Sequence, residues 1–416
     1  MGNAVTALDL ILRNGRIRGR DEPLDVGIAG GRIVALESRL AGDAPAQEDL
    51  GGKLLCAGFV ESHIHLDKSC ILERYEPLTG TLKEAISEVS ELKRTFTKED
   101  IYARARRTLE KAILQGTMRM RTHVEVDPRV GLRGFDAIRQ LGRDYAWAID
   151  LEICVFPQEG LTNDPGTEEL LIAACEAGAD LIGGCPYTDS DSRGHLDRIF
   201  ALARRFDLDI DLHLDFDLDP ARTDLEAVWL RTSEHGHGGR VAVGHVTKLS
   251  AIDRARVEES IAPMLARAGV AVTVLPATDL FLMGHEHRHS VPRGVAPAHC
   301  LLDRGVTCSI ATNNVLNPFT PFGDCSLLRM ANLYANVAHL LRREQHAACF
   351  DMVTSQPAKL MRLADYGIAV GNPADLVVLD CTDAAAAVEE IATPLFGLKR
   401  GRRTFSRPAA RLHPPE

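Results

Sequence analysis

The chain is predicted to fold as an α/β protein, a (β/α)₈ barrel with a small β-domain built from both of its ends. Through its middle, apolar strand-like segments alternate with amphipathic helical segments, as in α/β folds. Polar residues follow most of these strands, and this barrel collects its functional side chains at that end. The two ends of the chain instead show short strands and turns. A doubly wound sheet fits less well, because its functional residues would gather at one switch point.

The middle of the chain carries the strand pattern in a series of separate segments. They cover residues 58–65, 118–126, 151–157, 180–186, 209–215, 240–246, 270–276 and 307–313. Amphipathic helical patterns lie between most of them, for example at residues 98–115, 168–177, 196–206 and 252–268. Repeated βα units over about 300 residues match the size of a (β/α)₈ barrel.

The ends of the chain predict a separate β-domain. The predicted N-terminal strands are residues 8–14, 15–19, 24–30 and 31–38, with turns at Asn14-Gly15 and Gly30-Gly31. Near the other end, a turn at 371–373 precedes a buried strand at 376–380 and a hairpin at 396–406. We therefore expect residues 1–56 and 366–416 to form the small domain and residues 57–365 to form the barrel.

Composition narrows the classes of function. The net charge of −10 argues against general nucleic-acid binding, which requires a basic surface. No run of about 18 apolar residues is present, so we expect no membrane span. The 10 cysteines are scattered without a CxxC pair, which is typical of a reducing cytoplasm, and we expect a cytoplasmic protein.

Histidines follow several of the predicted strands. His63 and His65 end the first barrel strand, and alternate side chains of a strand share a face. Two imidazoles on one face can bind one divalent metal ion. His123, His213 and His245 stand in equivalent places after later strands. This repetition indicates a metal-centred hydrolytic site rather than exposed surface histidines.

The motifs that carry these histidines resemble a known family. In chain order they are GFVESHIHLDK, RTHVEVD, VFPQEG, DIDLHLD, VAVGHVTKLS, NPFTPFGD and DYGIAVGNPADLVVL. Together they resemble the amidohydrolase superfamily and, within it, the cytosine deaminase-like branch. The resemblance runs nearly end to end. It is much more specific for the family than for the substrate.

The resemblance implies a fold and a set of site residues. The fold would be a (β/α)₈ barrel with a β-sandwich made from both termini. His63, His65 and His213 match the metal-binding histidines, and His245 matches the histidine that hydrogen-bonds the metal-bound water. Gln158 matches the glutamine that reads the pyrimidine edge. The implied cofactor is one divalent metal ion, zinc or iron.

Elementary chemistry agrees with these roles. A divalent ion lowers the pKa of bound water to about 7 and supplies hydroxide at neutral pH. The carboxamide of Gln158 offers one acceptor and two donors, enough to recognise an amidine or imide edge. The alternative for Gln158 is a polar loop residue that caps a helix.

Two positions depart from the family pattern. Asn313 stands where the family has an aspartate that binds metal and takes a proton from water. Phe216 stands where the deaminases have a glutamate that moves a proton to the ring nitrogen. Asn313 can still offer a neutral oxygen to a metal, so we keep it as a candidate ligand and catalytic residue. The site should bind metal more weakly and be more positive, which suits an anionic substrate.

Other residues of these motifs keep two interpretations each. Lys68 is expected either to bind substrate or to be a solvated lysine or a partner of Asp67. Asp215 lies two residues after His213, so it could act as general base or orient a neighbouring side chain. The same two interpretations, general base or orienting group, stay open for Glu125 and Asp127. The histidine-rich segment 284–289 is expected to be a polar loop rather than a second metal site.

We expect a metal-dependent hydrolase of a non-peptide C–N bond in a small nitrogen heterocycle, cyclic amide or amidine. A neighbouring alternative is removal of a substituted amine from a ring. An alternative of another class is an inactive paralogue or small-molecule binding protein. The expected partners are a small-molecule substrate and further copies of the chain in a homo-oligomer, with neither nucleic acid nor membrane.

Overall fold

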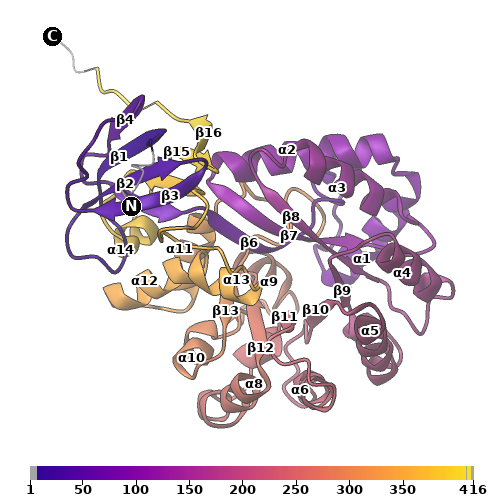
Figure 1. Ribbon diagram of the computed structural model, residues 1–416. Coiled ribbons are helices and arrows are strands. Elements are labelled where there is room, and N and C mark those ends of the chain that lie inside the picture. Colours follow the sequence, from indigo (N-terminus) through magenta and orange to yellow (C-terminus); the bar gives the residue numbers. More distant parts are fainter. Residues whose placement is uncertain (1–6, 409, 414–416) are drawn as a thin grey trace.

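The computed structural model describes residues 7–408 and 410–413. Its centre is an eight-stranded parallel sheet in the order β13-β12-β11-β10-β9-β8-β7-β6, with helices on its outer side (Figure 1). The strands are β6 (Phe59–Ile64), β7 (Thr117–Glu125), β8 (Asp150–Phe156), β9 (Leu181–Gly184), β10 (Asp209–Leu214), β11 (Val241–His245), β12 (Val270–Val274) and β13 (Cys308–Ile310). The predicted (β/α)₈ barrel is confirmed.

The barrel closes where the segment after β13 meets β6. The backbone N–H of Asn313 donates to the carbonyl of His63, and the N–H of His65 donates to the carbonyl of Asn313, each at 2.9 Å. Lower in the same seam, the hydroxyls of Ser62 and Ser309 lie 2.8 Å apart. Closure therefore places Asn313 beside the two histidines of the first barrel strand.

The α-helices of the structure are α1 (Leu82–Leu92), α2 (Lys98–Leu114), α3 (Arg133–Asp144), α4 (Thr167–Glu176), α5 (Ser192–Phe206), α6 (Leu225–Glu234), α7 (Arg254–Arg256), α8 (Ala262–Ala268), α9 (Pro276–Leu282), α10 (Ala298–Asp303), α11 (Leu327–Val337), α12 (Arg343–Asp351), α13 (Ser355–Leu360) and α14 (Ala384–Glu389). The helical patterns at 98–115, 168–177 and 196–206 are confirmed as α2, α4 and α5, and the pattern at 252–268 forms α7 and α8 with a π-helical turn at Val257–Ile261 between them. In α2, the Thr97 side chain caps the first turn, and Ile101, Ala105 and Leu109 bury one face at helical spacing. None of the described helices is both long and apolar enough to cross a bilayer.

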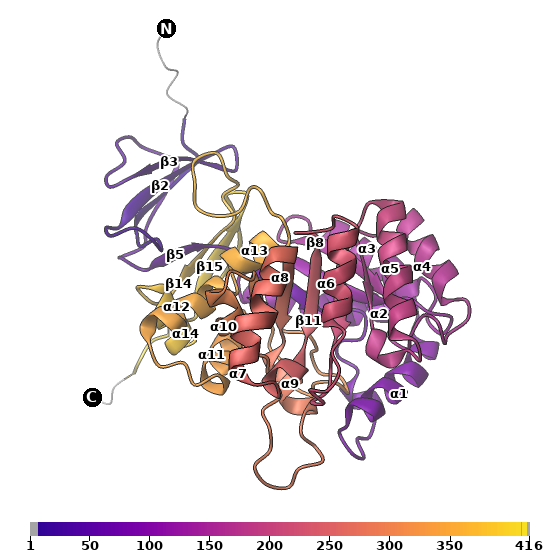
Figure 2. The ribbon, with the colours of Figure 1, turned by 90° about the horizontal axis from the view of Figure 1, so that it is seen from below.

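The ends of the chain form two four-stranded sheets that share a core. One contains β1 (Leu10–Gly15), β2 (Leu24–Ala29), β3 (Arg32–Glu37) and β4 (Ala46–Asp49). The other contains β5 (Leu54–Ala57), β14 (Leu376–Leu379), β15 (Pro394–Lys399) and β16 (Arg402–Ser406). Apolar side chains of both sheets pack together, as expected for a β-sandwich from both termini. The sandwich lies at one side of the barrel (Figure 2). The domain boundaries at residues 56 and 366 stay a prediction.

Two details of the N-terminal sheet differ from expectation. Residues 15–19 are not a strand of their own, because Gly15 ends β1 and the carbonyl of Ile17 accepts from Arg20 N–H in a turn. Asn14-Gly15 is an irregularity inside β1 rather than a turn, with Asn14 at φ 56°. The Gly30-Gly31 turn is confirmed, since both glycines have positive φ and link β2 to β3 directly.

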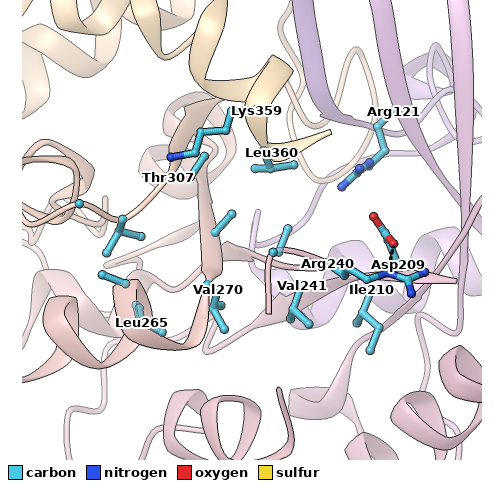
Figure 3. A pocket seen from close by; sticks show the side chains of 17 residues that line it. Arg121, Asp209, Ile210, Arg240, Val241, Leu265, Val270, Thr307, Lys359 and Leu360 are labelled. Atoms are coloured by element: carbon cyan, nitrogen blue, oxygen red, sulfur yellow. Dashed lines mark hydrogen bonds and ion pairs between the residues drawn. The ribbon is translucent and has the colours of Figure 1, made fainter. Parts of the chain in front are cut away.

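A cavity of about 180 Å³ lies at the end of the barrel where the strands begin (Figure 3). The first residues of β10, β11 and β12 line it together with Lys359 and Leu360 of α13. Ala358 and Leu360 pack here on Val60, so α13 covers this end of the barrel. The active ends of barrel strands are the opposite ends.

The shared core of the sandwich predicts a clear effect of a single truncation. Leu398 is 1% exposed between the two sheets, so Leu398→Ala should lower the free energy of unfolding by about 2–5 kcal/mol in urea denaturation. Leu412 is 96% exposed, so Leu412→Ala is the matched control and should change stability by less than about 0.5 kcal/mol. Equal stability of the two variants would show that the sheets do not share a core.

Candidate active site

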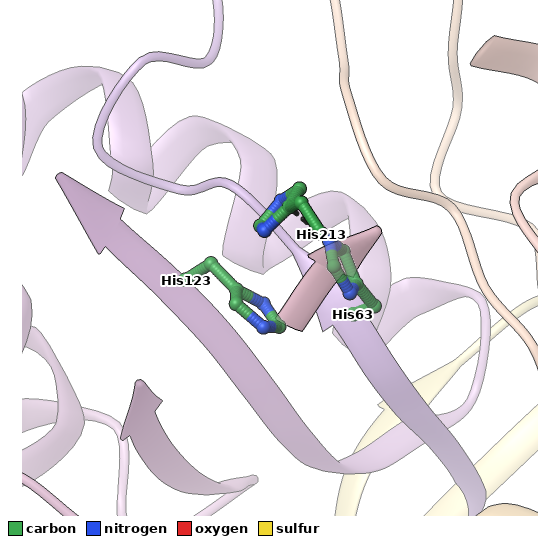
Figure 4. A group of neighbouring side chains, drawn as sticks. All are labelled: His63, His123 and His213. Carbon is green, nitrogen blue, oxygen red and sulfur yellow. Dashed lines mark hydrogen bonds between the residues drawn. The ribbon is translucent and has the colours of Figure 1, made fainter. Parts of the chain in front are cut away.

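Three histidine rings converge at the carboxyl ends of the barrel strands. His63 lies in β6, His65 follows that strand, and His213 lies in β10. The Nε2 atom of His213 is 3.1 Å from Nε2 of His63 and 3.1 Å from Nε2 of His65. Figure 4 shows His63 and His213 with His123 of β7, their rings turned toward one another inside the barrel. His213 therefore contacts both histidines of the first barrel strand.

The chemistry of the three rings fits a divalent ion. Burial, followed by the charge of neighbouring groups, lowers the pKa of His63, His65 and His213 well below the usual value. The rings are therefore neutral, which is the form that binds a metal. Two Nε2 atoms at 3.1 Å can share only one proton, whereas one ion accepts the lone pairs of all three rings.

Asn313 is bonded through its backbone to His63 and His65. It is fully buried at φ 65°, a conformation that asparagine adopts more readily than most residues. Neither side-chain atom of Asn313 has a hydrogen-bond partner among the described residues. Buried polar atoms are nearly always paired, so an amide without a partner beside three histidines is suited to a metal or a substrate.

His123 is a further buried ring, and it faces a carboxylate. Its ring stacks on His63 at 3.8 Å and 26°. Its Nε2 lies 3.4 Å from Oδ1 of Asp211, while Oδ2 of Asp211 accepts from Arg121 at 2.8 Å. Burial opposes ionisation of Asp211, but His123 and Arg121 hold its pKa below the usual value. The ion pair between Arg121 and Asp211 thus holds the Asp211 carboxylate beside the ring of His123.

A second ligand set is close in geometry. His63, His123 and His213 also offer nitrogen atoms that lie within 4.8 Å of one another. His65 contacts His213 at 3.1 Å, while Nε2 of His123 lies 3.4 Å from Oδ1 of Asp211. His65 as the third ligand therefore stays a prediction.

His245 is held by a carboxylate that sequence reasoning missed. Its Nδ1 is 2.6 Å from Oδ1 of Asp279, which lies in the first turn of α9. The second oxygen of Asp279 accepts from the backbone N–H of Leu275 at 3.2 Å. A carboxylate at Nδ1 keeps the hydrogen there and leaves Nε2 as an acceptor. Asp279 therefore fixes the orientation of the His245 ring.

Phe216 packs against a face of the His245 ring. Its ring stacks on His245 at 3.8 Å and 24°, and it lies 6.0 Å from the ring of Tyr187. The predicted absence of a proton-moving glutamate has a structural counterpart, because an apolar ring packs against His245 instead.

Asp215 is engaged in the loop before α6. One carboxylate oxygen accepts from the Thr223 hydroxyl, and the other accepts from the N–H of Asp224 at 3.0 Å. Burial raises the pKa of Asp215 to about 6 although these hydrogen bonds oppose the shift. The geometry supports the orienting interpretation of Asp215, while its role as general base stays a prediction.

Lys68 and Gln158 meet in a buried network of charges. The ammonium of Lys68 donates to Oε1 of Glu125 at 2.6 Å and to Oε1 of Gln158 at 3.0 Å. Lys93 donates to the other oxygen of Glu125 at 2.6 Å. Although burial opposes it, the two ammonium groups hold the pKa of Glu125 below its usual value. Asp67 instead accepts from the N–H of Glu125, so its predicted pairing with Lys68 is not the main contact.

The remaining carboxylates and the histidine-rich segment lie outside the cluster of rings. Asp127 and Glu159 contact the ammonium of Lys93 at 2.5 Å and 2.6 Å, which fills the space between three carboxylates. The histidines of segment 284–289 are exposed, and none of them belongs to a metal-binding group among the described residues. That segment follows α9 as a polar loop, as expected.

The close packing around His63 predicts a variant that removes metal without unfolding the barrel. A Cβ at Gly244 of β11 would lie 3.1 Å from Cε1 of His63 and 3.2 Å from its Nδ1. Gly244→Ala should displace this ring and lower metal content in elemental analysis, with the circular dichroism spectrum unchanged. Gly142→Ala is the control, since its Cβ would make only ordinary contacts from 3.6 Å with Leu151. Full metal content in Gly244→Ala would argue that His63 is not a ligand.

Known proteins resemble this chain over nearly its whole length. A model described as "Amidohydrolase family" matches residues 147–405. An N-isopropylammelide isopropyl amidohydrolase of Pseudomonas sp. strain ADP is 28% identical over 95% of this chain and 96% of the relative. A pterin deaminase of Rhizobium rhizogenes is 30% identical over 85% of this chain and 81% of the relative.

Solved structures also resemble this chain over nearly its whole length. A 5-methylcytosine deaminase from Klebsiella pneumoniae liganded with 5-fluorocytosine has a TM-score of 0.93 at 28% identity, covering 97% of this chain and 99% of that one. An N-isopropylammelide isopropylaminohydrolase from Burkholderia multivorans has a TM-score of 0.83 at 28% identity, covering 95% and 97%. These matches confirm a metal-binding hydrolase that acts on C–N bonds other than peptide bonds in a small molecule. The chain belongs to the amidohydrolase family and, within it, to the cytosine deaminase-like branch.

Proposed function

We propose that the protein hydrolyses the bond between a ring carbon and an exocyclic nitrogen of a small heterocycle at the site of His63, His65 and His213. The observation that carries this proposal is that Nε2 of His213 lies 3.1 Å from Nε2 of both His63 and His65. These histidines would hold one divalent ion, zinc or iron, and the Asn313 amide oxygen is the proposed fourth ligand. Such an ion would supply hydroxide at neutral pH, which attacks an electron-poor ring carbon.

The proton would be handled by His245. Asp279 fixes the hydrogen on Nδ1, so Nε2 is free to accept a proton from the attacking water and return it to the leaving nitrogen. Asn313 cannot accept this proton, because an amide is not a base at neutral pH. His245 therefore takes the role that the family shares between a histidine and two carboxylates.

The walls of the site suit a flat ring. Phe156 stacks on His213 at 4.6 Å and 16°, and Phe216 stacks on His245. Aromatic faces of this kind hold planar heterocycles by stacking. Gln158 and Lys68 are the proposed polar contacts at the edge of the ring.

A second candidate reaction is removal of a substituted amine. Phe216 is the observation that favours it, because an apolar ring beside His245 can contact an alkyl group on the leaving nitrogen. Two similar proteins are named for removing an isopropyl amine from N-isopropylammelide. Deamination of cytosine is less favoured, since Phe216 cannot move a proton.

The proposal also includes an anionic substrate, assembly into a homo-oligomer and a cytoplasmic location. The ten cysteines are all free thiols, which suits a reducing compartment. Glu125 accepts from Lys68 and from Lys93, so the charge of Lys68 is balanced within the protein. The attraction for an anion therefore rests on the loss of the family aspartate at Asn313 more than on Lys68.

Replacement of two ligands tests the metal site and the activity together. The double variant His63→Ala/His65→Ala should lose its metal in elemental analysis and lose amine release from any active compound of a triazine, pyrimidine and pterin panel. The double variant His287→Ala/His289→Ala is the control, because both side chains lie in the exposed loop. Metal retained in the first variant would refute the assignment. Absence of both metal and turnover in the unmodified protein would favour an inactive binding protein.

Reversing the two departures from the family pattern should raise the affinity for metal. Asn313→Asp adds a negative ligand, so the variant should retain more metal than the unmodified protein during dialysis against a chelator. Combined with Phe216→Glu it should restore a trace of cytosine deamination, since general acid–base groups contribute roughly 10²–10⁴-fold each. Turnover of cytosine by the unmodified protein with kcat/KM of about 10⁴ M⁻¹s⁻¹ or above would contradict this interpretation.

A further inference from the structure

A cavity of about 640 Å³ lies beside the loop that joins α9 to α10 and projects from the barrel (Figure 2). Many of its polar side chains are basic, and none of the described residues that line it is an aspartate or a glutamate. The basic side chains are Arg254, His287, Arg293, His299 and His339. In the whole chain, Asp and Glu outnumber Lys and Arg by 58 to 48, so this lining departs from the average composition.

Arg293 brings a positive charge that no carboxylate of the described residues balances. Its guanidinium donates to the last backbone carbonyl of α11 at 2.8 Å, and no ion pair joins it to a described residue. The carboxylates nearby belong to other basic groups. Glu258 lies 3.8 Å from Arg254. Glu286 lies 3.4 Å from the ring of His287. The cavity therefore keeps an excess of positive charge, which attracts an anion.

Arg254 is held beside the cavity by a chain of polar groups. Its Nη1 donates to Nε2 of His299 at 3.3 Å and also contacts the thiol of Cys300. Burial, followed by the charge of Arg254, lowers the pKa of His299, so the ring is neutral and can accept this hydrogen. The guanidinium is thus fixed through one nitrogen, while its Nε and Nη2 make no hydrogen bond to a described residue.

The same contacts leave a donor on Tyr334, which is fully buried and lines the cavity. Because Nε2 of His299 is an acceptor, the ring hydrogen is on Nδ1, which lies 2.8 Å from the Tyr334 hydroxyl. The backbone N–H of His299 donates to the same hydroxyl at 3.0 Å. Burial raises the pKa of Tyr334, so the hydroxyl keeps its own hydrogen, which has no acceptor among the described residues. A buried donor without a partner suits a ligand that offers an acceptor.

The rest of the lining is largely apolar. Leu218 follows β10 and Leu249 follows β11, so the cavity lies at the same end of the barrel as the histidine cluster. Further apolar side chains come from Ile252, Val291, Val295, Ala296 and Val337. Ligand sites commonly combine such an apolar lining with a few polar groups that fix the orientation of the ligand.

We propose that this cavity binds a small organic carboxylate, with its charge at Arg254 and Arg293 and its apolar body against the aliphatic lining. A guanidinium matches a carboxylate through two parallel hydrogen bonds, and the Tyr334 hydroxyl adds a third donor. Because Glu258 offsets part of the charge of Arg254, a singly charged group fits better than a doubly charged one. No lining residue belongs to the histidine cluster, so this binding does not depend on the proposed function.

A pair of probes of nearly equal size tests the role of charge. Benzoate carries a carboxylate, and benzamide carries a neutral carboxamide on the same ring. Calorimetric titration of the metal-containing protein should give a Kd of about 1 mM or below for benzoate. Benzamide should bind about tenfold more weakly or worse, because hydrogen bonds to an ionised acceptor are stronger. No binding of benzoate, or equal binding of the two compounds, would overturn the proposal.

Exposed arginines allow a matched pair of variants that assign the binding to this cavity. Arg254→Gln/Arg293→Gln should weaken benzoate binding by about tenfold or more. Arg198→Gln/Arg205→Gln is the control, since it removes the same charge from α5, and Arg205 and Arg254 have equally exposed side chains, at 55%. Unchanged affinity in the first variant, as expected if benzoate bound a metal at the histidines instead, would contradict the proposal. An equal loss in both variants would contradict it as well.

The place of the ligand can also be seen directly. Crystals of the protein soaked in 4-bromobenzoate should show an anomalous bromine peak in the cavity beside Arg254 and Arg293. A bromine peak at the histidine cluster alone, or none in the crystal, would refute the assignment.

Discussion

The structure depends on burying several neutral imidazoles together at the mouth of a barrel. His63, His65 and His213 are at most 2% exposed, and burial of polar groups without partners is costly. Under the proposed function, a divalent ion bound by the three rings would remove this cost. The surrounding residues serve this arrangement. Glu61 accepts from the N–H groups of His63 and Thr312, so it ties β6 to the segment that carries Asn313.

Compared with the family pattern, the carboxylates near the histidines lie further from the proposed metal position. The position of the family aspartate is Asn313, which is neutral. The carboxylates that remain close are Asp211, 3.4 Å from His123, and Asp279, 2.6 Å from His245. Both act on histidines and not on the proposed metal position. The site can therefore orient rings well, while it offers less charge to a metal and fewer groups to carry protons than a deaminase with both carboxylates.

Much of this could be predicted from the sequence, because strand periodicity is local. Alternation placed His63 and His65 on one face, and the repeated strand-then-polar pattern placed His213 and His245 at the same end of the barrel. The same alternation places Asp211, two residues before His213, on the face of β10 that carries His213. Asp279 had no such signal, since it lies in a helix 34 residues beyond its partner. Lys93 had no such signal either, because its partners Glu125 and Asp127 lie 32 and 34 residues further along the chain. The strand predicted at 15–19 failed because a turn closes there.

The position of a metal ion tests the central claim most directly. Crystals of the protein as purified, measured on both sides of the zinc and iron absorption edges, would locate the ion and identify it. The account predicts one anomalous peak within about 2.0–2.2 Å of the Nε2 atoms of His63, His65 and His213. A peak among Glu125, Asp127 and Glu159 with none at the histidines, or no peak in an active protein, would contradict it.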